Sequence, residues 1–162
     1  MLSENEAPAT VQVMPTFEHV RSTVINAPPA TVRALVVDLH AWTKWSPWEA
    51  LDPELKRTYG GSDQGVGARY AWAGKKSGEG SMAITAATPD RVDLDLDFAK
   101  PIKANNKVVF RFDGEGSGTR VTWTMSGSRG LLLTMMGKLF FDGMVLKDFE
   151  KGLAKLKSVA ET

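Results

Sequence analysis

The hydrophobic residues of this chain follow two different spacings. From residue 55 to residue 126, apolar side chains recur at every second position, which is the spacing of a strand with one buried face. Turns that contain glycine or proline interrupt this alternation. It predicts six strands, at Leu55–Tyr59, Gly65–Ala73, Gly80–Ala87, Arg91–Phe98, Lys107–Asp113 and Thr119–Ser126, after an earlier strand at Phe17–Ile25. The turns between the six are short enough for antiparallel hairpins.

Helical spacing occurs on either side of these strands. Pro28 and Pro29 open an amphipathic pattern that predicts a helix over Pro28–Val37. Proline is tolerated at a helix start because its missing N–H would have no intrahelical partner. A second, short helix is expected over Leu39–Lys44. The last helical pattern runs from Leu131 to about Ala160, with an apolar stripe of Leu132, Met136, Leu139, Leu146, Phe149, Leu153 and Leu156.

This order of elements predicts an α+β fold. A sheet with one apolar face needs a cover, and the C-terminal helix has a matching apolar stripe. We therefore expect a curved antiparallel sheet of about seven strands wrapped round a long C-terminal helix, with two short helices after the first strand. Residues 1–16 are polar and carry Pro8 and Pro15, so a flexible N-terminal arm is expected before a single domain over residues 17–162.

Composition narrows the range of functions. The 162 residues include 20 Lys and Arg against 19 Asp and Glu, a formal charge of +1, which gives no reason to expect nucleic acid as a partner. The first residues lack the basic and apolar parts of a secretory signal. Charges interrupt the apolar stretch Leu131–Phe149, so stable membrane insertion is not expected. The absence of cysteine is typical of a reducing compartment, and we expect a cytoplasmic protein.

Neither a metal site nor a cofactor is expected. Asp93, Asp95 and Asp97 alternate with apolar residues, so they share one face of an extended strand. A calcium site instead needs a turn that folds its oxygen ligands round the ion. We interpret the three carboxylates as a solvated outer face that pairs with basic residues of neighbouring strands, such as Lys107.

Five segments, in this order, carry a resemblance to a known family: I-N-A-P-P-A-T-V with L-x-x-W-x-x-W-S-P-W, then G-V-G-A-R-Y-A-W, G-E-G-S-M-A-I, G-T-R-V-T-W-T-M and D-F-E-K-G-L-A-K-L-K. They resemble the SRPBCC superfamily (START/Bet v 1-like proteins), and more narrowly its polyketide cyclase/dehydrase-like branch. The resemblance covers about residues 17 to 161 and implies the helix-grip fold that birch-pollen allergen, lipid-transfer START domains and aromatase/cyclases share. It also implies a hydrophobic pocket between the sheet and the C-terminal helix, entered near the loops at one end.

The inward faces of the predicted strands and helix indicate how such a pocket would be lined. Methionine and aromatic side chains suit an adaptable apolar surface, although an ordinary core needs the same residues and part of the set is expected to touch no ligand. Trp45 is expected near the pocket mouth. The other expected ligand-binding residues are Tyr70, Trp72, Met82, Ile84, Leu94, Leu96, Phe98, Phe110, Trp123 and Met125 from strands, and Met136, Leu139, Phe140 and Met144 from the helix.

Catalytic groups are scarce in the sequence. There is no G-x-S-x-G nucleophile motif. The histidines, His19 and His40, have no motif partner and are expected at the surface. The remaining candidates for acid–base chemistry are the hydroxyls of Tyr70 and Tyr59 and the carboxyl of Glu79, for which a surface position is favoured.

Three functions are compatible with these observations. The favoured one is non-enzymatic binding or carriage of a hydrophobic small molecule such as a lipid, an isoprenoid or an aromatic polyketide. The alternative is an enzyme of the cyclase/dehydratase kind, which needs a shaped pocket and one or two acid–base groups. The third is an interaction module like the heat-shock-chaperone activators that share this fold, which would need an exposed docking patch. The chain itself is expected to be a monomer or a homodimer.

Overall fold

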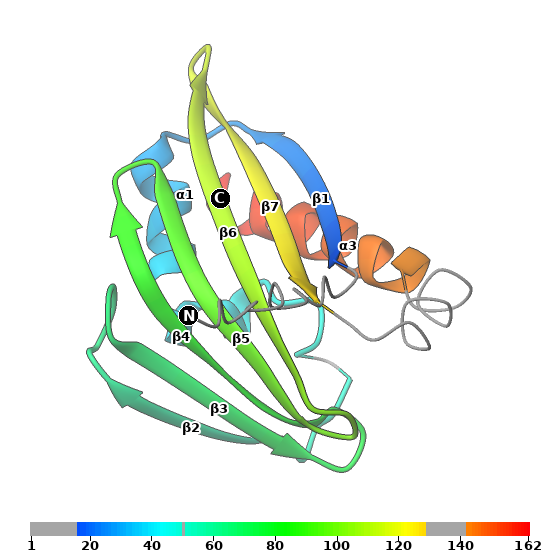
Figure 1. Ribbon diagram of the computed structural model, residues 1–162. Coiled ribbons are helices and arrows are strands. Elements are labelled where there is room, and N and C mark those ends of the chain that lie inside the picture. Colours follow the sequence, from blue (N-terminus) through cyan, green and yellow to red (C-terminus); the bar gives the residue numbers. More distant parts are fainter. Residues whose placement is uncertain (1–15, 50, 129–141) are drawn as a thin grey trace, which may run out of the picture.

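The computed structural model describes residues 16–49, 51–128 and 142–162 of the chain. Within these ranges, seven strands form one antiparallel sheet in the order β1-β7-β6-β5-β4-β3-β2 (Figure 1). Consecutive strands from β2 to β7 are neighbours, and β1 pairs with β7 at the far edge. The strands are β1 Thr16–Ile25, β2 Lys56–Gly61, β3 Ala68–Gly74, β4 Gly78–Thr88, β5 Arg91–Lys100, β6 Ala104–Glu115 and β7 Gly118–Ser128.

The largest differences from the predicted strand bounds are at the starts of β3 and β6, and backbone geometry and pairing give the reasons. β3 begins at Ala68 rather than Gly65, because Gly65 and Gly67 have φ values of 72° and 90° and form the turn after β2. β6 begins at Ala104 rather than Lys107, because Ala104 pairs with Phe98 at the end of β5. Cross-strand pairing thus extends strands beyond the segment in which hydrophobic alternation is clear.

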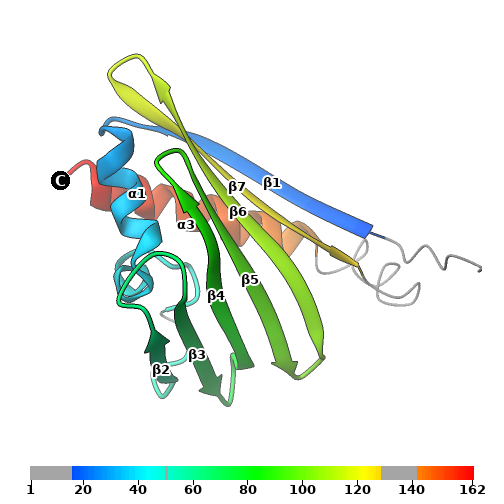
Figure 2. The same ribbon diagram turned by 60° about the vertical axis from the view of Figure 1, so that its left-hand side comes forward.

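The helices of the described ranges lie on one face of the sheet (Figure 2). Helix α1 spans Pro29–Val37, η1 is a 3-10 helix over Leu39–Lys44, and α3 spans Asp142–Ala160. α3 packs against β1, α1 and η1, so it covers the β1 side of the sheet more than the β2 side. The predicted helix start at Leu131 lies outside the described residues. The predicted architecture, a curved sheet with two short helices after the first strand and a C-terminal helix, is confirmed.

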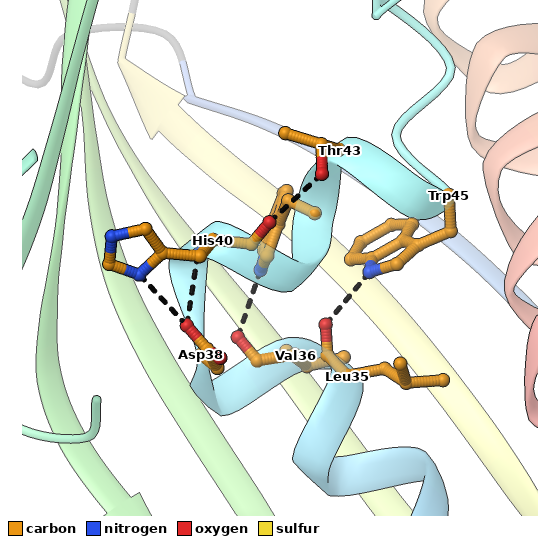
Figure 3. A network of polar contacts seen from close by, with 7 residues as sticks. Leu35, Val36, Asp38, His40, Thr43 and Trp45 are labelled. Atoms are coloured by element: carbon orange, nitrogen blue, oxygen red, sulfur yellow. Dashed lines mark hydrogen bonds and ion pairs between the residues drawn. The ribbon is translucent and has the colours of Figure 1, made fainter. Parts of the chain in front are cut away.

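Two tryptophans join η1 to α1. The indole Nε1 of Trp42 donates to the carbonyl of Val36 over 2.9 Å, and that of Trp45 donates to the carbonyl of Leu35 over 2.8 Å (Figure 3). The last carbonyls of a helix have no intrahelical donor, so α1 offers its C-terminal oxygens to these indoles. Trp45 is only 1% exposed. It is therefore a core residue, and the expected position at a pocket mouth is not what the structure shows.

The core continues from these indoles onto the sheet and α3. Trp42 and Trp45 meet Trp123 of β7 edge-on, with ring centroids 6.3 Å and 5.7 Å apart. Gly152 of α3 lies directly over Trp123: a Cβ on Gly152 would be 2.9 Å from Cζ3 of Trp123 and 3.0 Å from Cδ of Pro47. Glycine at this position therefore has a packing reason, because any side chain there would overlap the core.

On the outer face of the sheet, two carboxylates of the acidic row of β5 form ion pairs, and the pair of Asp95 is with a neighbouring strand as expected. Lys107 lies opposite Asp95 in the β5–β6 register and forms an ion pair with it, and Arg91 forms an ion pair with Asp93 at 2.6 Å. Among the described residues, no group of three His, Cys, Asp or Glu is placed to hold a metal ion. No helix in the same part of the chain is long and apolar enough to cross a membrane.

Candidate functional site

The inner face of the sheet carries a row of aromatic side chains at its β2 end. Tyr59 of β2 lies directly opposite Tyr70 of β3, and the two ring centroids are 5.2 Å apart. Trp72, two residues along β3, stacks on Tyr70 at 6.0 Å and meets Phe98 of β5 edge-on at 5.8 Å. We call Tyr59, Tyr70, Trp72 and Phe98 the aromatic row. Three of them, all but Tyr70, are only partly buried, so part of each of these three side chains is exposed to solvent.

An ion pair lies beside the aromatic row. Arg57 is the register partner of Trp72, so it projects from the same inner face. Its guanidinium Nη2 pairs with Oε2 of Glu49, which lies in the connection between η1 and β2. The side chains of Arg57 and Glu49 are 30% and 20% exposed, so water reaches the pair incompletely. We call Glu49, Arg57, Tyr59 and Tyr70 the edge cluster.

Both phenols of the edge cluster stay protonated at neutral pH. Burial raises the pKa of Tyr70 to about 12, and the carboxylate of Glu49 acts in the same direction, while Arg57 opposes it. Burial is also the largest reason why the pKa of Tyr59 is raised, with Glu49 contributing again. The hydrogen bond to Glu49 raises the pKa of Arg57 above its usual value. The two hydroxyls are therefore hydrogen-bond donors rather than general bases.

His40 extends the cluster towards η1. Its ring stacks on Tyr59, with centroids 4.0 Å apart and planes 19° from parallel, and its Nδ1 lies 3.1 Å from Oδ1 of Asp38 (Figure 3). Asp38 also accepts the backbone N–H of His40 at 3.0 Å, which caps the start of η1. The His40 side chain is more than half exposed, so the expected surface position is confirmed.

The residues predicted to line a pocket divide into groups by burial. Met136, Leu139 and Phe140 lie outside the described residues. The partly buried ones are Trp72 and Phe98. Four others are buried but retain a small exposed fraction, namely Tyr70, Met82, Leu96 and Met125. The most deeply buried are Trp45, Ile84, Leu94, Phe110 and Trp123. Ligand contact at all of these positions stays a prediction.

Met144 does not face the core. It is 55% exposed, whereas Val145 packs against the core and Phe149 is fully buried. At 3.6 residues per turn, Val145 lies one turn before Phe149 and shares its face, while Met144 is rotated by about 100° from Val145. The predicted apolar stripe was therefore correct for Phe149, and the inward position expected for Met144 is corrected.

An open hollow lies over β3, β4 and β5. It has a volume of about 650 Å³ and is bordered by Trp72, Phe98 and Glu79 among others. A Cβ at Gly80 would be 2.4 Å from Cζ2 of Trp72, so glycine is what allows the indole to lie across β4. Glu79 pairs with Lys100 at 3.6 Å and is about half exposed, in agreement with the expected surface position. A smaller hollow of about 490 Å³ lies between the ends of β1 and β7.

The surface position expected for His19 is wrong. His19 is 7% exposed, its Nε2 lies 3.2 Å from Oδ1 of Asp142, and its ring centroid is 5.2 Å from that of Phe17. β1 alternates, and His19 falls on the same face as Ile25, which is completely buried. The start of α3 covers that face. Alternation puts His19 on the face of Ile25, but β1 has apolar residues on both faces, so the packing of α3 decides that His19 is buried.

Three polar residues of structural or functional interest were missed from the sequence. Glu49 and Arg57 were not recognised because the register that brings them to Tyr70 is not visible in the local pattern. Asp52 is buried beneath the β3–β4 turn, where its Oδ2 accepts the backbone N–H groups of Lys76 and Ser77 at 3.1 Å and 3.3 Å. Burial by itself would raise the pKa of Asp52, but these hydrogen bonds, with one from Glu54, hold it below its usual value.

Comparison with known proteins agrees with this architecture. A seven-stranded curved sheet that closes on a C-terminal helix defines a helix-grip protein. The family model described as "Polyketide cyclase / dehydrase and lipid transport" matches residues 16–161, and the chain belongs to this family. No curated protein matches the sequence at a significant level.

Solved structures with low sequence identity share the fold. The KanY protein (ms6282) is 18% identical, with a TM-score of 0.69, and the match covers 92% of this chain and 100% of that one. The Aha1 protein of Colwellia psychrerythraea, solved as a dimer, is 16% identical with a TM-score of 0.61, over 91% and 97% of the two chains. Ara h 8.0201 is 10% identical with a TM-score of 0.64, over 90% and 98%.

Proposed function

We propose that this protein binds and carries a hydrophobic small molecule, such as a lipid, an isoprenoid or an aromatic polyketide-like compound, against the inner face of its sheet. The observation that carries the proposal is the aromatic row. Large apolar rings that belonged only to the core would be buried as completely as Trp45, yet Tyr59, Trp72 and Phe98 are partly exposed. Such surface is costly in water unless something covers it.

The place of the row in the fold supports the same function. α3 packs on the β1 side of the sheet, so its described part does not cover β2 and β3. Met82 and Leu96 lie next to the row on β4 and β5, as register partners on the inner face, and extend the apolar surface. The family to which the chain belongs includes lipid transport in its description. We propose Tyr70, Trp72, Met82, Leu96 and Phe98 as ligand contacts.

The experiment uses a neutral apolar fluorophore, N-phenyl-1-naphthylamine, whose emission rises when it leaves water. The wild-type protein is expected to bind it with saturation, and Trp72→Ala is expected to weaken binding about tenfold or more, because a large aromatic contact is lost. Val20→Ala is the matched control, since Val20 is an exposed apolar residue on β1, at the opposite edge of the sheet. Native mass spectrometry of gently purified protein gives an independent readout. No saturable binding, together with no co-purifying ligand, would reject the proposal.

A cyclase or dehydratase activity is the second candidate function. It rests on the two protonated phenols of the edge cluster, because Tyr59 and Tyr70 are able to donate protons or hydrogen bonds to a carbonyl oxygen. Glu79 is a further candidate acid–base group, although its pairing with Lys100 places it on the surface. Turnover of a linear poly-β-ketone by the wild type, lost in Tyr70→Phe with binding retained, would favour the enzyme. Turnover that survives in Tyr59→Phe, Tyr70→Phe and Glu79→Gln would reject these assignments.

A further inference from the structure

We propose that the edge cluster binds a neutral oxygen of the ligand, a hydroxyl or a carbonyl, and that Glu49 makes the site select against carboxylates. This inference rests on the proposed function and names the class of ligand that the same surface takes. It would make the ligand an apolar ring compound with an uncharged oxygen at one end, and not a fatty acid or another organic anion.

The charge balance of the cluster is the first argument. Arg57 carries the positive charge on this part of the inner face, and the carboxylate of Glu49 already pairs with it. A ligand carboxylate placed beside Arg57 would also lie beside Glu49, and two carboxylates in one partly buried site repel each other. Asp38 adds a further negative charge, close enough to raise the pKa of Tyr59. An incoming anion would therefore lose its hydration without gaining an unpaired cation.

The hydrogen-bonding groups are the second argument. Tyr59 and Tyr70 remain protonated, so each offers a hydroxyl that donates to a ligand oxygen. A guanidinium has five N–H donors, and the pair with Glu49 does not use them all. A carboxylate accepts more than one hydrogen bond, so Glu49 is able to accept a hydrogen bond from a ligand hydroxyl while it pairs with Arg57. The cluster thus has partners for both functions of a hydroxyl and for the oxygen of a carbonyl.

The direction of the aromatic row is the third argument. It leads from Tyr59 and Tyr70, beside the Glu49–Arg57 ion pair, through Trp72 to Phe98. The planes of Tyr70 and Trp72 are 24° from parallel, so a ligand ring that stacks on Trp72 would lie nearly parallel to Tyr70 as well. A ring that lies over Trp72 brings its polar end to Tyr70 and Arg57, since Arg57 is the register partner of Trp72.

The test compares three probes that share one ring system: naphthalene, 2-naphthol, which is neutral at pH 7, and 2-naphthoate, which is ionised. Binding to the wild-type protein and to Glu49→Gln is measured by isothermal titration calorimetry. In the wild type, 2-naphthol is expected to bind about tenfold or more tightly than 2-naphthoate, and more tightly than naphthalene. In Glu49→Gln, Arg57 is released, and 2-naphthoate is expected to gain about tenfold or more relative to 2-naphthol.

Two further variants keep the result unambiguous. Glu115→Gln removes a carboxylate that pairs with Arg120 on the surface, and it is expected to leave all three affinities unchanged. Should Glu49→Gln fail to fold, as judged by circular dichroism, Arg57→Gln provides the second measurement. That variant leaves the Glu49 charge without its partner, so it is expected to weaken 2-naphthoate more than 2-naphthol.

The outcomes separate the inference from the proposed function. Equal affinity for naphthalene and 2-naphthol would leave apolar binding intact and overturn the role of the edge cluster. A wild-type preference for 2-naphthoate, or a Glu49→Gln variant with unchanged selectivity, would overturn it as well. Failure of all three probes and of N-phenyl-1-naphthylamine to bind, together with no co-purifying ligand in native mass spectrometry, would reject the proposed function itself, and the inference with it.

Discussion

The indole of Trp123 lies flat on the ring of Phe149, with centroids 4.1 Å apart and planes 8° from parallel. This contact joins β7 to α3, and both side chains are almost completely buried. Phe149→Ala is expected to lower the free energy of unfolding by about 3–5 kcal/mol, because it removes buried apolar surface and leaves a cavity beside Trp123. Urea unfolding followed by tryptophan fluorescence measures the change.

Met144→Ala is the control for the preceding variant, since Met144 is an exposed residue of the same helix. It is expected to change stability by no more than about 0.5 kcal/mol. A loss below about 1 kcal/mol in Phe149→Ala would mean that the stacked contact does not hold α3 on the sheet.

The two glycines of α3 are expected to respond to alanine in opposite directions. At Gly152 a new Cβ would overlap Trp123 and Pro47, so Gly152→Ala is expected to cost about 1–3 kcal/mol despite its better helix propensity. At Gly143 a Cβ meets nothing within 4 Å, so Gly143→Ala is expected to stabilise the protein by up to about 1 kcal/mol. Thermal unfolding of both variants measures the signs. A Gly152→Ala variant that is more stable than the wild type would contradict the close approach at Gly152.

A buried hydroxyl joins β7 to the start of α1. Oγ1 of Thr119 donates to the carbonyl of Ala27 over 2.7 Å, and Thr119 is completely buried. Thr119→Val keeps the shape but leaves that carbonyl without its donor, so we expect a loss of about 1–3 kcal/mol. Thr119→Ser retains the hydroxyl and is expected to lose less. If the two variants are equally stable in denaturant unfolding, the hydrogen bond contributes nothing measurable.

The chain has two tyrosines, so their ionisation is directly observable. Absorbance of the phenolate near 295 nm is expected to show Tyr70 titrating well above pH 10 in Tyr59→Phe, because burial is the largest cause of its raised pKa. The folded protein holds this proton more tightly than the unfolded chain, whose tyrosine pKa is about 10. The stability that this proton contributes is therefore fully present below about pH 10. It is lost as the pH rises towards 12, by about 1.4 kcal/mol per pH unit. Circular dichroism recorded in parallel separates ionisation from unfolding. A midpoint near pH 10 in folded protein would contradict the burial of Tyr70.

Much of the fold was predictable because strand and helix periods depend on neighbours a few residues apart. β5 is an example, because Val92, Leu94 and Leu96 face the core. On its outer face, Asp93 forms an ion pair with Arg91, and Asp95 forms one with Lys107. The predicted end of the first helix at Val37 and the predicted second helix over Leu39–Lys44 agree with α1 and η1. These features are properties of single segments or of adjacent hairpin strands.

The candidate site was predictable only in part. Periodicity assigned Tyr70 and Trp72 to the inner face of a strand, where they are, but it treated the whole inner face alike. The pattern did not distinguish core residues from exposed ones on this face. Phe110 is covered by α1 and η1, whereas Trp72 remains partly exposed. That distinction depends on where the helices end on the sheet, and no local pattern records it.

By itself, the sequence determined the order of the strands and helices, the alternation of side chains between the two faces of each strand, and the family. The tertiary structure decided which of those side chains meet. Trp45 became core because α1 ends with free carbonyls beside it, and His19 became buried because the start of α3 covers it. Glu49 and Arg57 came together because the register of β2 and β3 sets Arg57 opposite Trp72, next to the segment that follows η1. Contacts of this kind depend on packing between distant segments, which hydrophobic spacing within one segment does not specify.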